Sequence, residues 1–278
     1  MRAGLIQLCS GDDPAANLAI TERLVREAAA GGAELIVTPE CTNIVTFDRE
    51  RQRRLLAVEA EDATLARLRV VAGELGVWLV IGSLLLKGDD AADGRFVNRC
   101  LVVGPDGAVH ARYDKIHMFD VDLPGGETYR ESAAYRPGER AVTVEAAGTR
   151  LGITICYDLR FPGLYRDLAL AGARILTIPA AFTVPTGRAH WEVLMRARAI
   201  ENGCFVLAPA QSGEHAASDG GRARLTYGHS IAVAPWGEVL ADAGDPVGVS
   251  LVDLDLEAVE EARRRVPSIA HGRAYSAP

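Results

Sequence analysis

The sequence predicts an α/β fold in which two similar halves stack as a four-layer αββα sandwich related by a pseudo-two-fold axis. The first observation behind this is an internal repeat, in which turn and helix-end residues recur in the same order at similar spacing. The matching residues and their separations are Pro39 and Pro179 (140 residues), Gly76 and Gly203 (127), and Gly107 and Gly237 (130). The second is that apolar strand-like runs alternate with amphipathic segments in each half. Two such halves can bury one sheet face against each other and leave their helices outside.

The elements of the first half follow from local patterns. Short apolar runs predict strands at residues 4–9, 35–38 and 77–81. Asp and Pro favour helix starts and Gly favours helix ends. The expected helices therefore run from Asp13-Pro14 to Gly31 and from about Asp62 to Gly76. A hairpin at residues 103–109 closes the half.

The second half repeats this order. The expected strands are residues 152–156, 175–178 and 204–207, and the hairpin returns at 233–239. One expected helix runs from about Pro162 to Gly172. A second expected helix ends at Gly203 and has Val193, Ala197 and Ile200 on its apolar stripe. The halves span about 4–115 and 152–253. We expect residues 1–278 to form one domain, with the tail at about 254–278 as a candidate contact in an oligomer.

Composition and charge exclude several classes of function. The chain has 278 residues, 30 basic and 37 acidic, and a net charge of −7 with the acids spread along it. It has no basic groove that would attract nucleic acid. It lacks a signal-peptide pattern and any apolar run near the roughly 18 residues that would cross a bilayer. Neither nucleic acid nor a membrane is therefore expected as a partner.

The five cysteines are widely spaced and odd in number: Cys9, Cys41, Cys100, Cys156 and Cys204. No C-x-x-C pair is present, which argues against a disulfide framework and against structural zinc. A reducing compartment, and hence the cytoplasm, fits best. Most of these thiols are expected to be small core residues.

Cys156 differs from the others because it stands where an apolar strand meets a helix that starts at Pro162. A side chain at that bend lies at the mouth of the sheet, near a helix N-terminus. We expect this setting to lower the pKa of the thiol and expose it to a substrate. The alternative is a buried structural cysteine.

Two other residues could act with this thiol. Glu40 closes a strand of the first half that the repeat pairs with the strand of Cys156, and its carboxylate could exchange a proton with the thiol. Lys115 follows the first hairpin, and its ammonium could stabilise an oxyanion without a metal. The structural alternatives are a capping or surface glutamate and a solvated surface lysine.

These residues lie in motifs that resemble the nitrilase superfamily of carbon–nitrogen hydrolases over nearly the whole chain, from about Leu5 to Tyr275. The matching segments are Thr38-Pro39-Glu40, Asp114-Lys115-Ile116-His117, Cys156 to Pro162, Ala189-His190-Trp191-Glu192, Tyr227-Gly228-His229-Ser230 and Pro235-Trp236-Gly237. The resemblance implies a duplicated αββα sandwich with a Glu–Lys–Cys triad, no cofactor and no metal. Members typically form homodimers or larger assemblies.

Carried over by position, the resemblance implies Glu40 as the base, Lys115 as the oxyanion lysine and Cys156 as the nucleophile. The backbone N–H of Tyr157 would be the second oxyanion donor. Glu131 occupies the segment of a second family glutamate, which would position the lysine and the substrate.

Within the superfamily the motifs look most like the Nit branch of ω-amidases and deaminated-glutathione amidases. This implies a carboxylate-bearing amide, for which Arg160 and Thr183 are the predicted contacts. Alternatively, Arg160 could pair with Asp158 or Glu192 and hold the loop. An N-carbamoyl or aliphatic amide remains an alternative substrate, and the polar stretch 213–224 is expected to be an exposed loop.

Two readings outside this activity remain open. A metal-dependent phosphoesterase can also use a duplicated αββα sandwich, but it would need clustered acidic residues and would leave Cys156 and Lys115 without roles. A catalytically silent binding relative would not need Glu40, Lys115 and Cys156 together.

Overall fold

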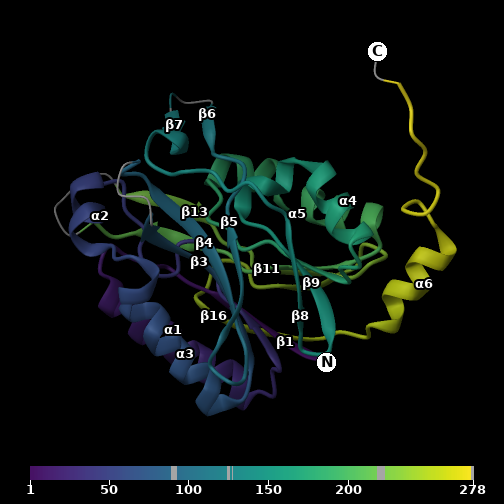
Figure 1. The fold of residues 1–278 in the computed structure, drawn as a ribbon, viewed down its shortest axis with the longest axis horizontal. Coiled ribbons are helices and arrows are strands. Elements are labelled where there is room, and N and C mark those ends of the chain that lie inside the picture. The colour runs from purple at the N-terminus through teal and green to yellow at the C-terminus, as the bar shows by residue number, and fades with distance from the viewer. Residues whose placement is uncertain (89–92, 124–125, 127, 218–222, 277–278) are drawn as a thin grey trace.

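The computed structural model describes residues 1–88, 93–123, 126, 128–217 and 223–276, and it has the predicted four layers (Figure 1). Helices α1 (Pro14–Ala30) and α3 (Ala63–Leu75) cover one side. Helices α4 (Pro162–Leu170) and α5 (Val184–Asn202) cover the other side, and two sheets lie between them. The αββα prediction is confirmed.

The first sheet has six strands in the described residues, in the order β16-β1-β2-β3-β4-β5. Their bounds are Gly248–Asp253, Arg2–Gln7, Leu35–Val37, Trp78–Lys87, Phe96–Val103 and Val109–Asp114. Strands β1, β2 and β3 are parallel, and β4, β5 and β16 pair antiparallel with their neighbours. The parallel core of the sheet is therefore extended by antiparallel strands at both edges.

In the described residues, the second sheet has the strand order β8-β9-β10-β11-β14-β15. Its strands are Val142–Ala146, Thr149–Ile153, Ile175–Thr177, Phe205–Ala208, Ile231–Val233 and Val239–Asp242. Strands β9, β10 and β11 are parallel and the others antiparallel. Because this repeats the first sheet strand for strand, the predicted duplication is confirmed.

Both boundaries of the predicted second half are wrong. Strand β16 falls inside the predicted second half, 152–253, yet it pairs with β1 in the first sheet. Strand β8 takes the equivalent edge of the second sheet, although it precedes residue 152. A strand at the edge of a sheet exposes unpaired backbone groups. Each sheet here gains an additional edge strand from sequence outside its own predicted half.

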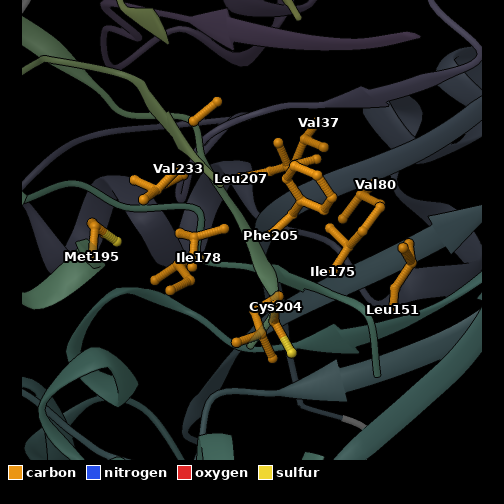
Figure 2. Packing of buried hydrophobic residues seen from close by; sticks show 14 of the residues in the cluster. Val37, Val80, Leu151, Ile175, Ile178, Met195, Cys204, Phe205, Leu207 and Val233 are labelled. Atoms are coloured by element: carbon orange, nitrogen blue, oxygen red, sulfur yellow. The ribbon is translucent and has the colours of Figure 1, made fainter. Parts of the chain in front are cut away.

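Strand alternation divides the buried side chains between two cores. In β2, Leu35 and Val37 point into the space between the sheets, whereas Ile36 packs towards α1 and α3. Figure 2 shows the core that includes the space between the sheets, where Val37 and Val80 of the first sheet lie near Ile175 and Phe205 of the second. Both faces of these strands are buried, as the continuous apolar runs predicted.

The helix ends follow the predicted caps. The Asp13 carboxylate accepts from the Ala15 N–H at 2.9 Å, and the Asp62 carboxylate accepts from the Leu65 N–H at 2.7 Å. Gly76 and Gly203 end their helices with φ of 65° and 55°, in the left-handed region that favours glycine. Of two further helices, α6 (Glu257–Arg265) confirms the short helix that the sequence predicts after Val252, whereas α2 (Arg49–Leu55) was not predicted.

The predicted apolar stripe of α5 is wrong. Val193 is 69% exposed and Ile200 is 53% exposed, whereas Trp191 and Met195 are buried in the core. The helix packs with the face that also carries Arg198, whose guanidinium donates to the Leu159 carbonyl. A polar residue on the buried face concealed the true stripe from a reading of hydrophobic spacing.

Two small hairpins lie outside the main sheets. One pairs β6 (Asp120–Asp122) with β7 (Thr128–Arg130), and the other pairs β12 (Ser212–His215) with β13 (Arg224–Tyr227). The stretch 213–224, predicted as an exposed loop, thus begins and ends in strands, and His215 is buried. Residues 218–222 of that stretch lie outside the described residues.

The packing of α5 gives a direct stability test. Met195→Ala should lower the free energy of unfolding by about 2–5 kcal/mol, because it removes a buried side chain. Val193→Ala, on the same helix but exposed, should change it by no more than about 0.5 kcal/mol. Denaturant unfolding measures both, and equal losses would contradict the observed face.

Candidate active site

A cavity of about 200 Å³ lies where strands of both sheets end. Its walls come from the segment 40–52 after β2, the β6–β7 hairpin, the segment 181–186, strand β13 and η3 (Cys156–Arg160), a single 3-10 turn that follows β9. Glu40, Lys115, Glu131 and Cys156 all line it. The structure therefore brings together the four side chains that the sequence singled out.

The route by which Glu40 and Cys156 meet differs from the one predicted. Cys156 follows β9, whose counterpart in the first sheet is β1, whereas Glu40 follows β2, whose counterpart is β10. The predicted equivalence of their two strands is wrong. Both residues still follow parallel central strands of stacked sheets, and the carboxyl ends of these strands open onto the same cavity.

Lys115 is the charged centre of the cavity and is only 2% exposed. Its Nζ donates to Glu40 Oε1 at 2.9 Å and to Glu131 Oε1 and Oε2 at 3.0 and 2.9 Å. Burial acts to lower the pKa of Lys115, but the charges of Glu131 and Glu40 outweigh it and the pKa lies well above its ordinary value. The lysine is therefore a fixed cation.

Backbone N–H groups fix the two carboxylates. The Ala181 N–H donates to Glu40 Oε2 at 2.9 Å, and the Phe119 N–H donates to Glu131 Oε2 at 2.7 Å. Burial acts to raise the pKa of Glu40, but Lys115 and its other partners outweigh this effect and the pKa is lowered. Glu40 is thus an ionised, oriented carboxylate.

The Cys156 thiol lies beside this carboxylate, and its backbone is held in an uncommon conformation. Its φ is 49°, in the left-handed region that non-glycine residues rarely adopt, and its N–H donates to the Pro179 carbonyl at 2.9 Å. Burial, and next to it the charge of Glu40, raises the pKa of the thiol well above its ordinary value, although Lys115 partly opposes them. The predicted lowering of this pKa is wrong, because burial and the neighbouring Glu40 carboxylate outweigh the expected effect of the bend.

A buried carboxylate shapes the turn that carries Cys156. Asp158 is fully buried and accepts from the Tyr113 hydroxyl at 2.6 Å and from the Ile155 N–H at 2.9 Å. Its other oxygen lies 2.7 Å from His117 Nδ1 and accepts from the His117 N–H at 3.1 Å. These contacts tie η3 to the strand that leads into Lys115.

The other predicted residues lie at different distances from the cavity. The Tyr157 N–H is in the first turn of η3, where helical N–H groups lack intrahelical acceptors, and it has no acceptor among the described residues. Thr183 lines the cavity, but its hydroxyl shares a 2.8 Å hydrogen bond with Thr186. Arg160 does not line it.

Arg160 lies behind the cavity wall. Its guanidinium carbon is 5.6 Å from the ring centroid of Phe182, which does line the cavity, and its Nη2 lies 3.2 Å from His190 Nδ1. The alternative that Arg160 pairs with Asp158 or Glu192 is wrong, since Asp158 binds the groups named above and Glu192 pairs with Arg196.

The sequence reading missed Asn98 and Arg224, which both line the cavity. Asn98 Nδ2 donates to Glu40 Oε1 at 2.9 Å and is 3.5 Å from Glu131 Oε1, and the Asn98 carbonyl accepts from the Lys115 N–H. A polar residue inside the apolar strand 96–103 was the signal that could have identified it. Arg224 carried no such signal, because it adjoins a polar stretch.

The arrangement can perform proton transfer and nucleophilic attack. A neutral thiol lies beside an ionised carboxylate, so the proton can move from Cys156 to Glu40 when a substrate carbonyl lies next to the sulfur. Lys115 supplies a positive charge that an oxyanion could share.

Residues 2–264 match the family described as carbon-nitrogen hydrolase. The deaminated glutathione amidase of Yersinia enterocolitica is 40% identical over 274 residues, which cover 98% of this chain and 93% of that protein. The omega-amidase NIT2 of Homo sapiens is 37% identical over 266 residues, covering 96% and 92%. Both relatives are matched over nearly their whole length.

Solved structures share the fold. The C. elegans NitFhit protein has a TM-score of 0.88 and 34% identity; the match covers 98% of this chain but only 65% of that longer one. Saccharomyces cerevisiae Nit3, a member of branch 10 of the nitrilase superfamily, has a TM-score of 0.83 and 28% identity, covering 96% and 94%. XC1258 from Xanthomonas campestris has a TM-score of 0.83, 29% identity and coverage of 100% and 99%, and carries an arsenic adduct in its active site.

The raised pKa of the thiol can be tested through Glu40. Glu40→Gln removes the anion that disfavours the thiolate and leaves Lys115 in place, so the pKa of Cys156 should fall. The ultraviolet absorbance of the thiolate, recorded as pH rises and corrected with a Cys156→Ala control, measures this. An unchanged or higher titration midpoint in Glu40→Gln would contradict the assigned cause.

Proposed function

The chain belongs to the carbon–nitrogen hydrolase family, and we propose that it hydrolyses the amide bond of a small carboxylate-bearing molecule through a thioester on Cys156. The observation that carries this proposal is the buried ion pair of Lys115 with Glu40 and Glu131, beside a thiol, in one cavity. Burying such charged groups lowers the stability of the fold, so their presence in a cavity favours a catalytic role.

In the first step the Cys156 sulfur attacks the amide carbon as its proton passes to Glu40. Negative charge develops on the amide oxygen, where Lys115 Nζ and the Tyr157 N–H stabilise it. The intermediate collapses as protonated Glu40 gives its proton to the leaving nitrogen. The C–N bond breaks, an amine or ammonia departs, and an acyl thioester remains on Cys156.

In the second step Glu40, ionised again, takes a proton from a water molecule that attacks the thioester carbon. The same oxyanion donors stabilise the second intermediate. Its collapse breaks the C–S bond, and Glu40 returns the proton to sulfur. Glu131 holds Lys115 in place throughout and borders the substrate.

An unpaired acceptor supports an amide as the substrate. Asn98 Oδ1 is buried without a hydrogen-bond partner, although Asn98 lines the cavity beside Glu40 and Glu131. Buried polar atoms without a partner are uncommon and unfavourable. An amide N–H of the substrate would satisfy this oxygen.

For the substrate, we propose deaminated glutathione or an ω-amide of a 2-oxo acid. Two relatives reported above are named deaminated glutathione amidase and omega-amidase. The 2-oxo acid group is what the resemblance to the Nit branch implies. Thr183 remains a proposed hydroxyl contact. Arg160 packs against Phe182, which lines the cavity, but does not line the cavity itself. An N-carbamoyl or aliphatic amide is the alternative within the family.

The metal-dependent phosphoesterase considered from the sequence is not supported by the family match. Its acidic residues would have to bind a cation, whereas Glu40 and Glu131 both bind Lys115. The proposed reaction uses no cofactor or metal.

The nucleophile prediction separates the three functions that the sequence left open. Cys156→Ala should abolish amide hydrolysis and leave the unfolding transition intact, since the side chain is small. A thiol alkylator should inactivate the wild-type chain, and EDTA should not. Ammonia release from a panel of ω-amides is the assay. Turnover by Cys156→Ala, or dependence on EDTA-sensitive metal, would refute the mechanism, and no turnover at all would indicate a silent relative.

We also propose that the chain acts as one domain, in the cytoplasm, as a homodimer. All five cysteines are free, which suits a reducing compartment. No helix in the described ranges is both long and apolar enough to cross a bilayer. The C-terminal segment runs away from the body beyond α6, and its Tyr275 is 90% exposed, which supports the tail as a contact between copies (Figure 1).

The tail contact predicts a change in assembly. The full chain should sediment as a dimer, and a chain ending at Gly272 should shift towards monomer, because it loses the exposed residues that include Tyr275. Dimers of both chains would contradict a role of the tail. A monomeric full chain would contradict the homodimer itself.

A further inference from the structure

Arg224 brings spare hydrogen-bond donors to the catalytic cavity. A guanidinium has five N–H donors. Within the described residues, the guanidinium of Arg224 donates a hydrogen bond from Nη2 to the Ala181 carbonyl at 2.8 Å. Arg224 Nε is buried and has no acceptor. No carboxylate in the described part of the chain forms an ion pair with this side chain. The guanidinium interacts electrostatically with the Glu40 carboxylate, but its unpaired Nε leaves a donor for the anion of a ligand.

The guanidinium is held in place before any ligand binds. Strand β13 pairs with β12, and Thr226 of β13 also bridges to Thr183. The guanidinium carbon lies 5.9 Å from the ring centroid of Phe47, in a cation–π contact. A prepositioned fork loses little conformational entropy when it binds a planar anion.

The position of Arg224 places it next to the reacting groups. Ala181 accepts from Arg224 through its carbonyl and donates to Glu40 through its N–H, so one residue connects the two. The other cavity arginines are engaged elsewhere: Arg130 pairs with Asp122, and Arg49 contacts Gln52 and Tyr135.

We propose that Arg224 binds the carboxylate of the substrate and sets the preference for carboxylate-bearing amides. The inference rests on the proposed amidase function and assigns a residue to its specificity. Arg224 takes this role in place of Arg160, because Arg224 lines the cavity and Arg160 does not.

Two amides of equal chain length test the assignment. Glutaramate carries a carboxylate at the end remote from its amide, and pentanamide carries a methyl group there. Arg224→Ala should lower kcat/KM for glutaramate about 10- to 100-fold, as expected for a lost charge-assisted contact. It should change pentanamide hydrolysis less than about threefold. Arg224→Lys should restore only part of the loss, because an ammonium cannot reproduce the fork.

Control variants separate this role from others. Arg188→Ala, an exposed position on α5, should leave both activities unchanged. Equal losses on the two amides in Arg224→Ala would overturn the proposal, because Arg224 would then act through Glu40. A selective loss for glutaramate in Arg160→Ala but not in Arg224→Ala would also overturn it, and would assign the carboxylate to Arg160.

A binding measurement keeps the test independent of turnover. Calorimetry should show glutaramate binding about 10- to 100-fold more weakly to Cys156→Ala/Arg224→Ala than to Cys156→Ala. Equal affinities would refute the role of Arg224. If the wild-type chain hydrolysed neither amide, the proposed function would fail, but this comparison would still decide whether Arg224 binds the carboxylate.

Discussion

The catalytic cavity depends on one constraint, the burial of the Lys115 ammonium. An unpaired buried charge is too costly to keep, so the protein surrounds it with the carboxylates of Glu40 and Glu131. Each of these needs its own donors, and the N–H groups of Ala181 and Phe119 supply them. Removing Lys115 would leave two buried carboxylates without their cation, whereas removing either glutamate leaves the lysine with one partner.

The same constraint explains the protonation of the nucleophile. Burial disfavours the charged thiolate, and the ionised Glu40 beside it disfavours a second anion, so the pKa of the thiol rises. A neutral thiol beside an oriented carboxylate loses its proton only when the developing charge can move onto a substrate. The left-handed backbone of Cys156 and the buried Asp158, which supports the turn, keep the sulfur in position for this proton transfer.

The fold provides this arrangement through duplication with one asymmetry. Stacking two copies of the same sheet places the carboxyl ends of parallel strands from both copies around one cavity. Glu40 and Cys156 follow strands that are not equivalent, β2 and β9, so the two halves share one architecture but contribute different side chains to the cavity. The hairpins β6–β7 and β12–β13, outside both sheets, add the residues that border the substrate.

The layers, the duplication, most helix caps and the set of Glu40, Lys115, Glu131 and Cys156 could be predicted before the fold was known, because periodicity, capping residues and motifs are local signals. The buried face of α5, the pairing of β16 and the presence of Arg224 in the cavity could be assigned from the three-dimensional structure alone. These depend on contacts between residues far apart in the chain, such as Arg224 with Ala181. The pKa of Cys156 belongs with them, since it follows from burial and the distant Glu40 and not from the adjoining sequence.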